Sequence, residues 1–156
     1  RLAQALRISR EQGLPRYESL QPLYNLYDRE GYEKELEPLC RAEEVGVINY
    51  YALAAGFLSG KYRSEADLGG RARAGTVQKR YLNDRGLRIL EAMDVVAADH
   101  GATVAQIALA WLLARPGITA PIVSATSVEQ LQQIVAAPQI KLTPYQVRLL
   151  TQASGL

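Results

Sequence analysis

Apolar residues recur at intervals of three and four positions along much of the chain, which is the spacing of one face of an α-helix. Three such stretches are followed by a glycine, the residue that most easily takes the left-handed conformation at a helix end. They predict helices over residues 1–12, 32–45 and 86–99, closed by Gly13, Gly46 and Gly101.

Three further helices are predicted from capping boxes, in which a hydroxyl and a Gln side chain satisfy free N–H groups of the first turn. The pairs are Thr103 with Gln106, Ser127 with Gln130, and Thr143 with Gln146. Pro144 follows Thr143 at the first helical position, where its missing N–H costs nothing.

The other apolar runs predict three short strands, YESLQPLYN (17–25, giving onto a loop), VINYY (47–51) and ITAPIV (118–123). Residues 52–85 are polar and Gly-rich and predict a loop far longer than the usual connection of about 4–6 residues, a length typical of functional or disordered loops. Strands that alternate with helices indicate a parallel sheet. Because a parallel sheet is normally covered on both faces, three strands alone make it incomplete.

Residues 1–156 have the length of one ordinary domain. The net charge of +2, from 18 basic and 16 acidic residues, does not indicate nucleic acid or an anionic membrane as the main partner. The single cysteine, Cys40, excludes an internal disulfide and lies on an apolar stripe with Leu36 and Leu39, so we expect it to be buried.

No apolar run approaches the roughly 20 residues of a membrane span, and no signal peptide is recognised. Together with the single cysteine, this indicates a reducing, cytoplasmic location and no membrane partner. The chain opens at Arg1 inside a helical pattern, so we expect it to be the middle of something longer.

Four segments together resemble the aldo-keto reductase family, whose members are (β/α)8 barrels. LQPLYNLYDR (20–29) is similar to the sixth strand and its loop, and VINYYALAAGFLSGKYR (47–63) to the segment around the seventh strand. TVAQIALAWLLARP (103–116) and ITAPIVSATSVEQLQQIV (118–135) resemble the helix before the eighth strand and that strand with its helix. The resemblance covers almost the whole chain and implies an α/β fold. The chain would be the C-terminal portion of a (β/α)8 TIM barrel, about strands 6–8 with their helices, whereas a whole barrel takes about 250 residues.

The resemblance also implies that this portion carries much of a cradle for a nicotinamide cofactor, NADP(H) or NAD(H). Tyr50 would stack on the nicotinamide ring, and a tyrosine that leaves a strand end does offer a flat face to a planar heterocycle. Gln21 would bind the carboxamide, because an amide side chain can both donate and accept hydrogen bonds. Packing in the barrel mouth and exposure to solvent are the respective alternatives. Tyr51 occupies a position where relatives often carry serine, and no ligand is assigned to it.

Two further segments are implied to hold the cofactor's phosphates. A loop over the pyrophosphate, where small residues let backbone N–H groups approach, would begin with Leu53, Ala54 and Gly56. Ser59, Lys61 and Arg63 would add charge there, unless they form a solvated loop tip. A helix N-terminus beside the adenosine phosphate would contain Ser124, Thr126, Ser127, Gln130 and Gln133, which would also serve as a plain helix cap. Many relatives carry Arg or Lys there, but no basic residue lies between Ser124 and Gln133, which leaves the preference between NADPH and NADH open.

The family's catalytic Asp, Tyr, Lys and His lie in an earlier part that is not matched here, so no catalytic residue and no metal site is predicted. His100 stands at a helix C-terminus, where the helix dipole favours a cation. Trp111 falls on an apolar stripe and is expected to pack in the core. The implied function is part of an NAD(P)H-dependent oxidoreductase that reduces small aldehydes and ketones to alcohols, with this chain alone inactive.

Two other functions are considered. A non-catalytic half-barrel would associate with a partner or a second copy, because unpaired edge strands invite association. A helix-turn-helix DNA-binding module is disfavoured, because ARPGITAPIVSA (114–125) separates the two candidate helices and neither helix is rich in Lys or Arg.

Overall fold

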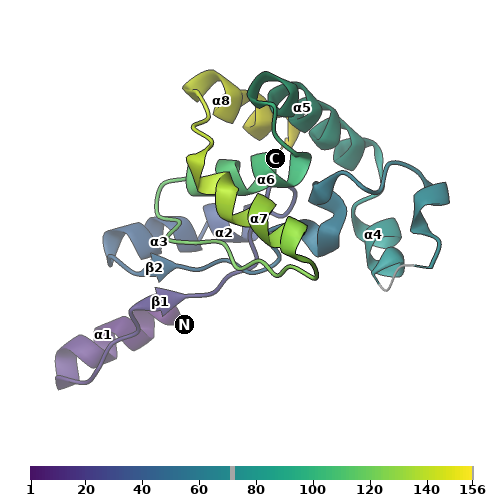
Figure 1. Ribbon diagram of the computed structural model, residues 1–156. Coiled ribbons are helices and arrows are strands. Elements are labelled where there is room, and N and C mark those ends of the chain that lie inside the picture. The colour runs from purple at the N-terminus through teal and green to yellow at the C-terminus, as the bar shows by residue number, and fades with distance from the viewer. Residues whose placement is uncertain (71–72, 156) are drawn as a thin grey trace.

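The structure is a computed structural model that describes residues 1–70 and 73–155 (Figure 1). The α-helices are α1 (Leu2–Gln12), α2 (Glu30–Glu33), α3 (Leu36–Ala42), α4 (Ala74–Arg80), α5 (Asp84–His100), α6 (Val104–Leu113), α7 (Val128–Ala136) and α8 (Pro144–Ala153). The strands are β1 (Ser19–Leu20) and β2 (Gly46–Val47), and the 3-10 helices are η1 (Ala54–Ser59), η2 (Glu65–Leu68) and η3 (Ala137–Gln139).

Strands β1 and β2 are parallel, with Ser19 opposite Gly46 and Leu20 opposite Val47. The pairing continues beyond the strands, because Ile48 N donates to Leu20 O over 2.9 Å and Tyr50 N to Pro22 O over 3.0 Å. The parallel arrangement expected from the alternation of strands and helices is therefore present.

The segment predicted as a third strand, residues 118–123, is not a regular strand. It pairs with β2 through one parallel bridge, Val47 with Ile118, and with the residues after β2 through a hydrogen bond of 2.9 Å from Ile122 N to Asn49 O. The N–H groups of Thr119 and Ala120 both donate to Val47 O, and Pro121 has no N–H to donate. The ladder is interrupted for this reason, although the segment still runs beside β2.

The helix predicted over residues 32–45 is divided into α2 and α3. Pro38 accounts for the break, because it lacks the N–H that would donate to the carbonyl of Lys34 and its ring would clash there. Gly46 does not end the helix, as the sequence suggested, because it is already part of β2. The left-handed residue that follows α3 is Glu44, with φ 53°.

The long loop predicted over residues 52–85 is wrong for most of that range, whose residues 71–72 lie outside the described residues. The segment forms η1, η2 and α4 and also contains the first residues of α5. Its apolar side chains, few and widely spaced in the sequence, enter the core; Phe57, Leu58, Val77 and Tyr81 are completely buried. Such short helices are marginal alone and depend on this packing, which hydrophobic periodicity does not reveal.

The helix termini follow their capping residues closely. α1 and α5 end at Gly13 and Gly101 in the left-handed conformation. The capping boxes at Thr103 and Thr143 are both formed. The third box is only half formed: Ser127 Oγ accepts from Gln130 N, but the Gln130 carboxamide turns to Thr126 N instead, 3.0 Å away.

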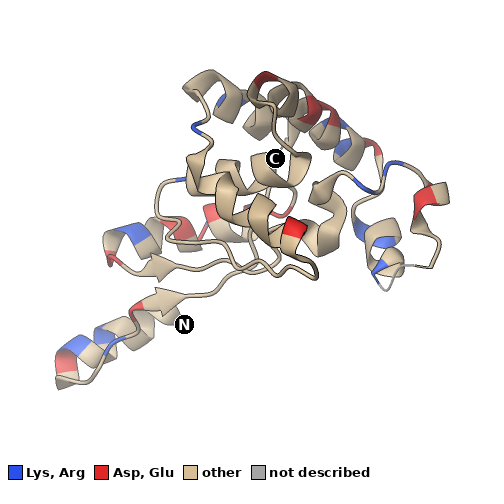
Figure 2. Ribbon diagram, in the orientation of Figure 1, with Lys and Arg blue, Asp and Glu red and all other residues tan. Residues whose placement is uncertain are grey.

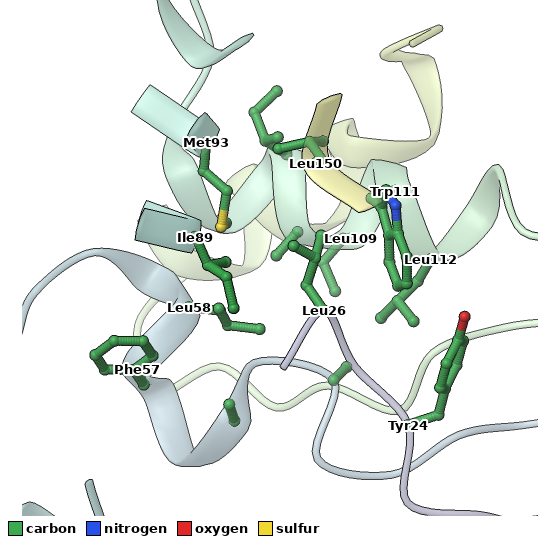
Figure 3. Close-up of a cluster of buried hydrophobic side chains, with 14 of the residues drawn as sticks. Tyr24, Leu26, Phe57, Leu58, Ile89, Met93, Leu109, Trp111, Leu112 and Leu150 are labelled. Atoms are coloured by element: carbon green, nitrogen blue, oxygen red, sulfur yellow. The ribbon is translucent and has the colours of Figure 1, made fainter. Parts of the chain in front are cut away.

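The core lies where α5, α6 and α8 pack together and η1 closes one side (Figure 3). Trp111 is fully buried, as its stripe predicted, and its indole N–H donates to Thr151 Oγ1 over 3.1 Å. Cys40 is also buried. Residues 107–112 of α6 are all buried, so this helix lies inside the core.

No single helix in the described ranges is long and apolar enough to cross a membrane. The helices α5 and α6 meet that criterion only as a pair, by length and composition, and the chain bends by 92° between them.

Candidate functional site

Three parallel segments end at the same edge of the structure. Tyr50 pairs with Leu23 through a parallel bridge, and the segment that leads to Ser124 runs beside Asn49. In sheets of this kind the carboxyl ends of the strands are where ligands bind. The edge therefore brings together Gln21, Tyr50 and the approach to α7 from separate parts of the sequence.

An open groove of about 570 Å³ lies at this edge. Of the cofactor-binding residues suggested by the sequence, Gln21 and Tyr50 line it, and the residues of the two phosphate segments do not. Its other lining residues are Leu20, Pro22, Leu23, Tyr27, Asp28, Arg29, Glu30, Gly31, Leu36 and Arg85. Pattern analysis missed the charged part of this lining, since Arg85 is distant in sequence and reaches the groove only through the fold.

Tyr50 presents an exposed ring at the groove, with 40% of its surface accessible. Its neighbour Tyr51 is equally open, and the two rings meet edge to face with centroids 5.8 Å apart. Tyr17 and Tyr145 are also exposed but do not line this groove, whereas Tyr24 and Tyr81 are completely buried. The pair at positions 50 and 51 thus offers aromatic surface to a ligand.

The chain that follows Tyr50 has an uncommon backbone. Tyr51, Ala54 and Ala55 have φ values of 61°, 48° and 57°, in the left-handed region that residues other than glycine rarely adopt. Each such residue costs on the order of 1–3 kcal/mol and persists only where its surroundings enforce it, commonly at ligand sites. This strained backbone indicates that residues 51–56 form a defined turn that the surrounding structure stabilises.

Gly56 and Lys61 lie against each other inside this turn. Gly56 has φ 90°, and a Cβ atom placed on it would lie 3.3 Å from both Cε and Nζ of Lys61. The missing side chain at Gly56 therefore leaves room for the lysine ammonium close to the backbone. A positive charge beside a tightly turned backbone is a suitable arrangement for an anion.

Ser59 and Arg63 do not reinforce that charge. Ser59 Oγ donates to Gly56 O over 2.7 Å. Arg63 donates to both carboxylate oxygens of Asp94 on α5, over 2.7 and 2.8 Å. The guanidinium of Arg63 is thus paired with Asp94, whereas Lys61 lies against the turn, with its Nζ 5.3 Å from the centroid of the Tyr62 ring.

The approach to α7 carries the remaining candidates from the sequence. Ser124, Thr126, Gln130 and Gln133 are all exposed, and Gln130 Oε1 accepts hydrogen bonds from the backbone N–H and the hydroxyl of Thr126. Glu129 is the single charged residue on α7 (Figure 2). The helix N-terminus therefore presents hydroxyl and amide groups together with the carboxylate of Glu129, and no side-chain cation.

A buried ionic network supports the groove from beneath. Arg29 makes a bidentate pair with Glu33, with N···O distances of 2.8 and 2.9 Å, and Tyr24 Oη donates to Glu33 over 2.7 Å. Burial alone would raise the pKa of Glu33, but the hydrogen bonds from Arg29 and Tyr24 and the charges of Arg29 and Arg115 hold that pKa below its usual range. Burial also raises the pKa of Tyr24 far above its ordinary value, so Tyr24 remains a donor at neutral pH. This network holds α2 in place, and the carboxylates that line the groove are paired separately, Asp28 with Arg80 and Glu30 with Lys34.

His100 lies away from this edge, at the C-terminus of α5. Its Nε2 is 3.0 Å from Gln146 Oε1 on α8, which makes it a contact between helices. Within residues 1–70 and 73–155, no cluster of three or more His, Cys, Asp or Glu side chains could hold a metal ion.

Comparison with known proteins gives the chain a family context. The model of the aldo/keto reductase family matches residues 2–154. The chain is 35% identical over 128 residues to an uncharacterized oxidoreductase of Bacillus subtilis, covering 81% of this chain and 37% of that protein. It is 40% identical over 126 residues to an uncharacterized oxidoreductase of Mycobacterium tuberculosis, covering 78% of this chain and 37% of the relative.

A third relative carries the family name. The chain is 31% identical over 131 residues to a probable aldo-keto reductase 1 of soybean, Glycine max, covering 83% of this chain and 38% of that protein. The matched region thus spans less than two fifths of the length of each of these relatives.

Proposed function

Because the chain belongs to the aldo/keto reductase family, we propose that it forms the cofactor-binding C-terminal portion of an NAD(P)H-dependent reductase of aldehydes and ketones. In this proposal β1, β2 and the segment 118–123 are the sixth, seventh and eighth strands of a (β/α)8 barrel. The groups that transfer a proton to the carbonyl oxygen would lie outside these 156 residues.

One observation carries the proposal: the exposed ring of Tyr50 shares a groove with Gln21, at the carboxyl ends of adjacent parallel strands. A flat aromatic face and a carboxamide side chain suit a nicotinamide, which has an aromatic ring and a carboxamide of its own. The left-handed turn with Lys61 follows directly and suits the pyrophosphate. The hydroxyls before α7 suit the adenosine end.

The chemistry divides between cofactor and protein. A bound nicotinamide nucleotide supplies a hydride for the carbonyl carbon, and the chain supplies placement. Tyr50 would fix the plane of the ring, Gln21 its rotation about the ring axis, and Lys61 the charge of the diphosphate. Since α7 offers no cation to a 2′-phosphate, the affinities for NADPH and NADH are expected to differ by less than in a site with an arginine there.

The proposal is tested by measuring the binding of NADPH to the chain, by calorimetry and by quenching of the cofactor's fluorescence. Tyr50→Ala is expected to weaken binding by about tenfold or more, because it removes the stacking face, which for a base on an aromatic ring is worth about 1–3 kcal/mol. Tyr50→Phe keeps the ring and should bind like the unaltered chain. Tyr145→Ala, at another exposed tyrosine, which lies on α8 and does not line the groove, is the matched control.

The same preparation is expected to show no carbonyl-dependent oxidation of NADPH with an aromatic aldehyde, because the chain lacks the proton donor. Absence of NADPH binding by the unaltered chain would refute the cofactor cradle. Turnover of the aldehyde would refute the division between a cradle here and chemistry elsewhere.

A second candidate function is association without catalysis, in which the open half-barrel pairs with a partner or with another copy. It is favoured by apolar side chains on α7 that are largely exposed: Val128 at 65%, Leu131 at 52% and Val135 at 61%. These residues share one face of the helix by their spacing.

A further inference from the structure

Asn25 is a buried polar residue that the cofactor proposal does not use. It follows Tyr24 in the loop after β1 and has no accessible surface. Its Oδ1 accepts from the backbone N–H groups of Tyr27 and Asp28, both over 2.8 Å, which forms an Asx turn. Its Nδ2 donates to Asp28 Oδ2 and to Tyr51 O, both over 3.0 Å. Both ends of the Asn25 carboxamide are therefore occupied.

The carbonyl oxygen of Tyr51 connects the loop after β1 with the left-handed turn after Tyr51. It accepts from Asn25 Nδ2 and also, over 2.8 Å, from Ala54 N, the amide that begins the left-handed turn. Tyr51 itself is left-handed, with φ 61°. A residue other than glycine keeps such a conformation only if its surroundings stabilise it. The hydrogen bond from the Asn25 side chain to the Tyr51 carbonyl stabilises it directly.

Tyr50 is thereby fixed from both sides. Its own N–H donates to Pro22 O over 3.0 Å, and the peptide that follows Tyr51 is anchored by Asn25. Asn49, the residue before Tyr50, is also buried and donates from Nδ2 to Tyr24 O over 2.7 Å. The strand ends are thus linked by side-chain amides where the backbone ladder stops.

We infer that Asn25 is a positioning residue for the cofactor site, acting through the Tyr51 carbonyl to fix both the ring of Tyr50 and the start of the turn that carries Lys61. The inference rests on the proposed function, since it assumes a nicotinamide at Tyr50. The Asn25 amide touches no ligand in this role. It couples the nicotinamide and pyrophosphate ends of the site and leaves the adenosine end at α7 unaffected.

The test compares two probes, NADPH and adenosine 2′,5′-bisphosphate, which contains only the adenosine end. Asn25→Asp keeps an acceptor oxygen for the Asx turn but replaces the donor, which faces Tyr51 O and Asp28 Oδ2, by a second oxygen. It is expected to weaken NADPH binding about tenfold, or about 1.4 kcal/mol at 25 °C, while the affinity for the bisphosphate changes less than twofold. Asn25→Ala is expected to lose at least as much NADPH affinity.

Thr143→Ala is the control for a purely structural effect, since Thr143 caps α8 away from the groove. It should lower the melting temperature and leave both affinities unchanged. If Asn25→Asp binds NADPH like the unaltered chain, or loses both probes equally, the positioning role is refuted while the cofactor cradle stands. If the unaltered chain binds NADPH no more tightly than the bisphosphate, the proposed function and the inference both fail.

Should neither Asn25 variant fold, the unaltered chain decides the question through hydrogen exchange. Bound NADPH is expected to slow exchange of the Ala54 amide and the Asn25 side-chain amide by about tenfold, and the bisphosphate to leave both unchanged. Equal exchange with both probes would overturn the inference.

Discussion

Gly86 shows how a single residue can be required by close packing alone. It lies in the first turn of α5, where its N–H is capped by Asn83 Oδ1 over 3.0 Å. A Cβ atom at this position would lie 1.9 Å from Tyr81 O and 2.8 Å from Phe57 Cζ. The first of these neighbours is backbone, so the clash cannot be relieved by rotating a side chain.

Gly86→Ala is therefore expected to lower the free energy of unfolding by about 2–3 kcal/mol, as overpacking of a core does. Urea unfolding followed by circular dichroism measures the change. Gly75→Ala in α4 is the matched control, because nothing lies within 4 Å of a Cβ there. It should be neutral or stabilising by up to about 1 kcal/mol. Equal stabilities of the two variants would contradict the packing argument.

At the scale of the element, α2 is stabilised by an ion pair, because it is too short to be stable alone. A helix of 4 residues has little stability of its own. Arg29, at its N-cap, pairs with Glu33 at its end and also donates to Thr151 O of α8 over 2.8 Å. The ion pair thus fastens the short helix that carries one wall of the groove.

The depressed pKa of Glu33 predicts how stability depends on pH. A carboxylate favoured in the folded state contributes stability above its unfolded pKa, near 4.3, and this contribution is lost as pH falls through the folded value. Glu33→Gln should cost about 1–3 kcal/mol at pH 7 and make the stability less dependent on pH below about 4.3.

Urea unfolding at pH 3 to 7 tests this prediction. Glu91→Gln is the control, since Glu91 is exposed on α5 and makes no ion pair with the described residues. A Glu33→Gln curve parallel to that of the unaltered chain throughout the acid range would show that the network does not depend on this carboxylate.

At the scale of the molecule, charged residues concentrate on α1, α3 and α5, while α6 and α7 are almost free of them (Figure 2). The apolar side chains exposed on α7 lie in this uncharged region. If association is a function of the open half-barrel, this face should take part in it.

Sedimentation at rising concentration is expected to show species heavier than the 17.2 kDa chain. Leu131→Gln should shift the equilibrium toward the monomer by about tenfold, because it removes a half-exposed leucine from the centre of the stripe. Val95→Gln, at a valine of similar exposure on α5, should not. A single 17.2 kDa species at all concentrations would exclude self-association by the chain.

Local signals in the sequence sufficed for the family and for the helix ends at Gly13, Gly101 and Thr103, but not for the end predicted at Gly46. The box at Thr103 and the glycines at positions 13 and 101 act within a few residues of themselves, so no distant contact could alter their effect. The breaks were harder to predict. Pro38 was visible in the sequence, but apolar residues continue at helical spacing on both sides of it, so the pattern predicted one helix where the structure has two.

The sequence by itself determined the helix ends at Gly13 and Gly101, the capping boxes at Thr103 and Thr143, and that Gln21 and Tyr50 follow two parallel segments. Only the tertiary structure decided that these two line one groove, that residues 52–70 and 73–85 are largely helical and packed, and that Asn25 holds the carbonyl of Tyr51. The physical reason is the sequence distance over which each effect acts. Helix caps and hydrophobic periodicity depend on residues three or four positions apart. The bond between Asn25 and Tyr51 spans 26 positions and exists only once two strands have paired.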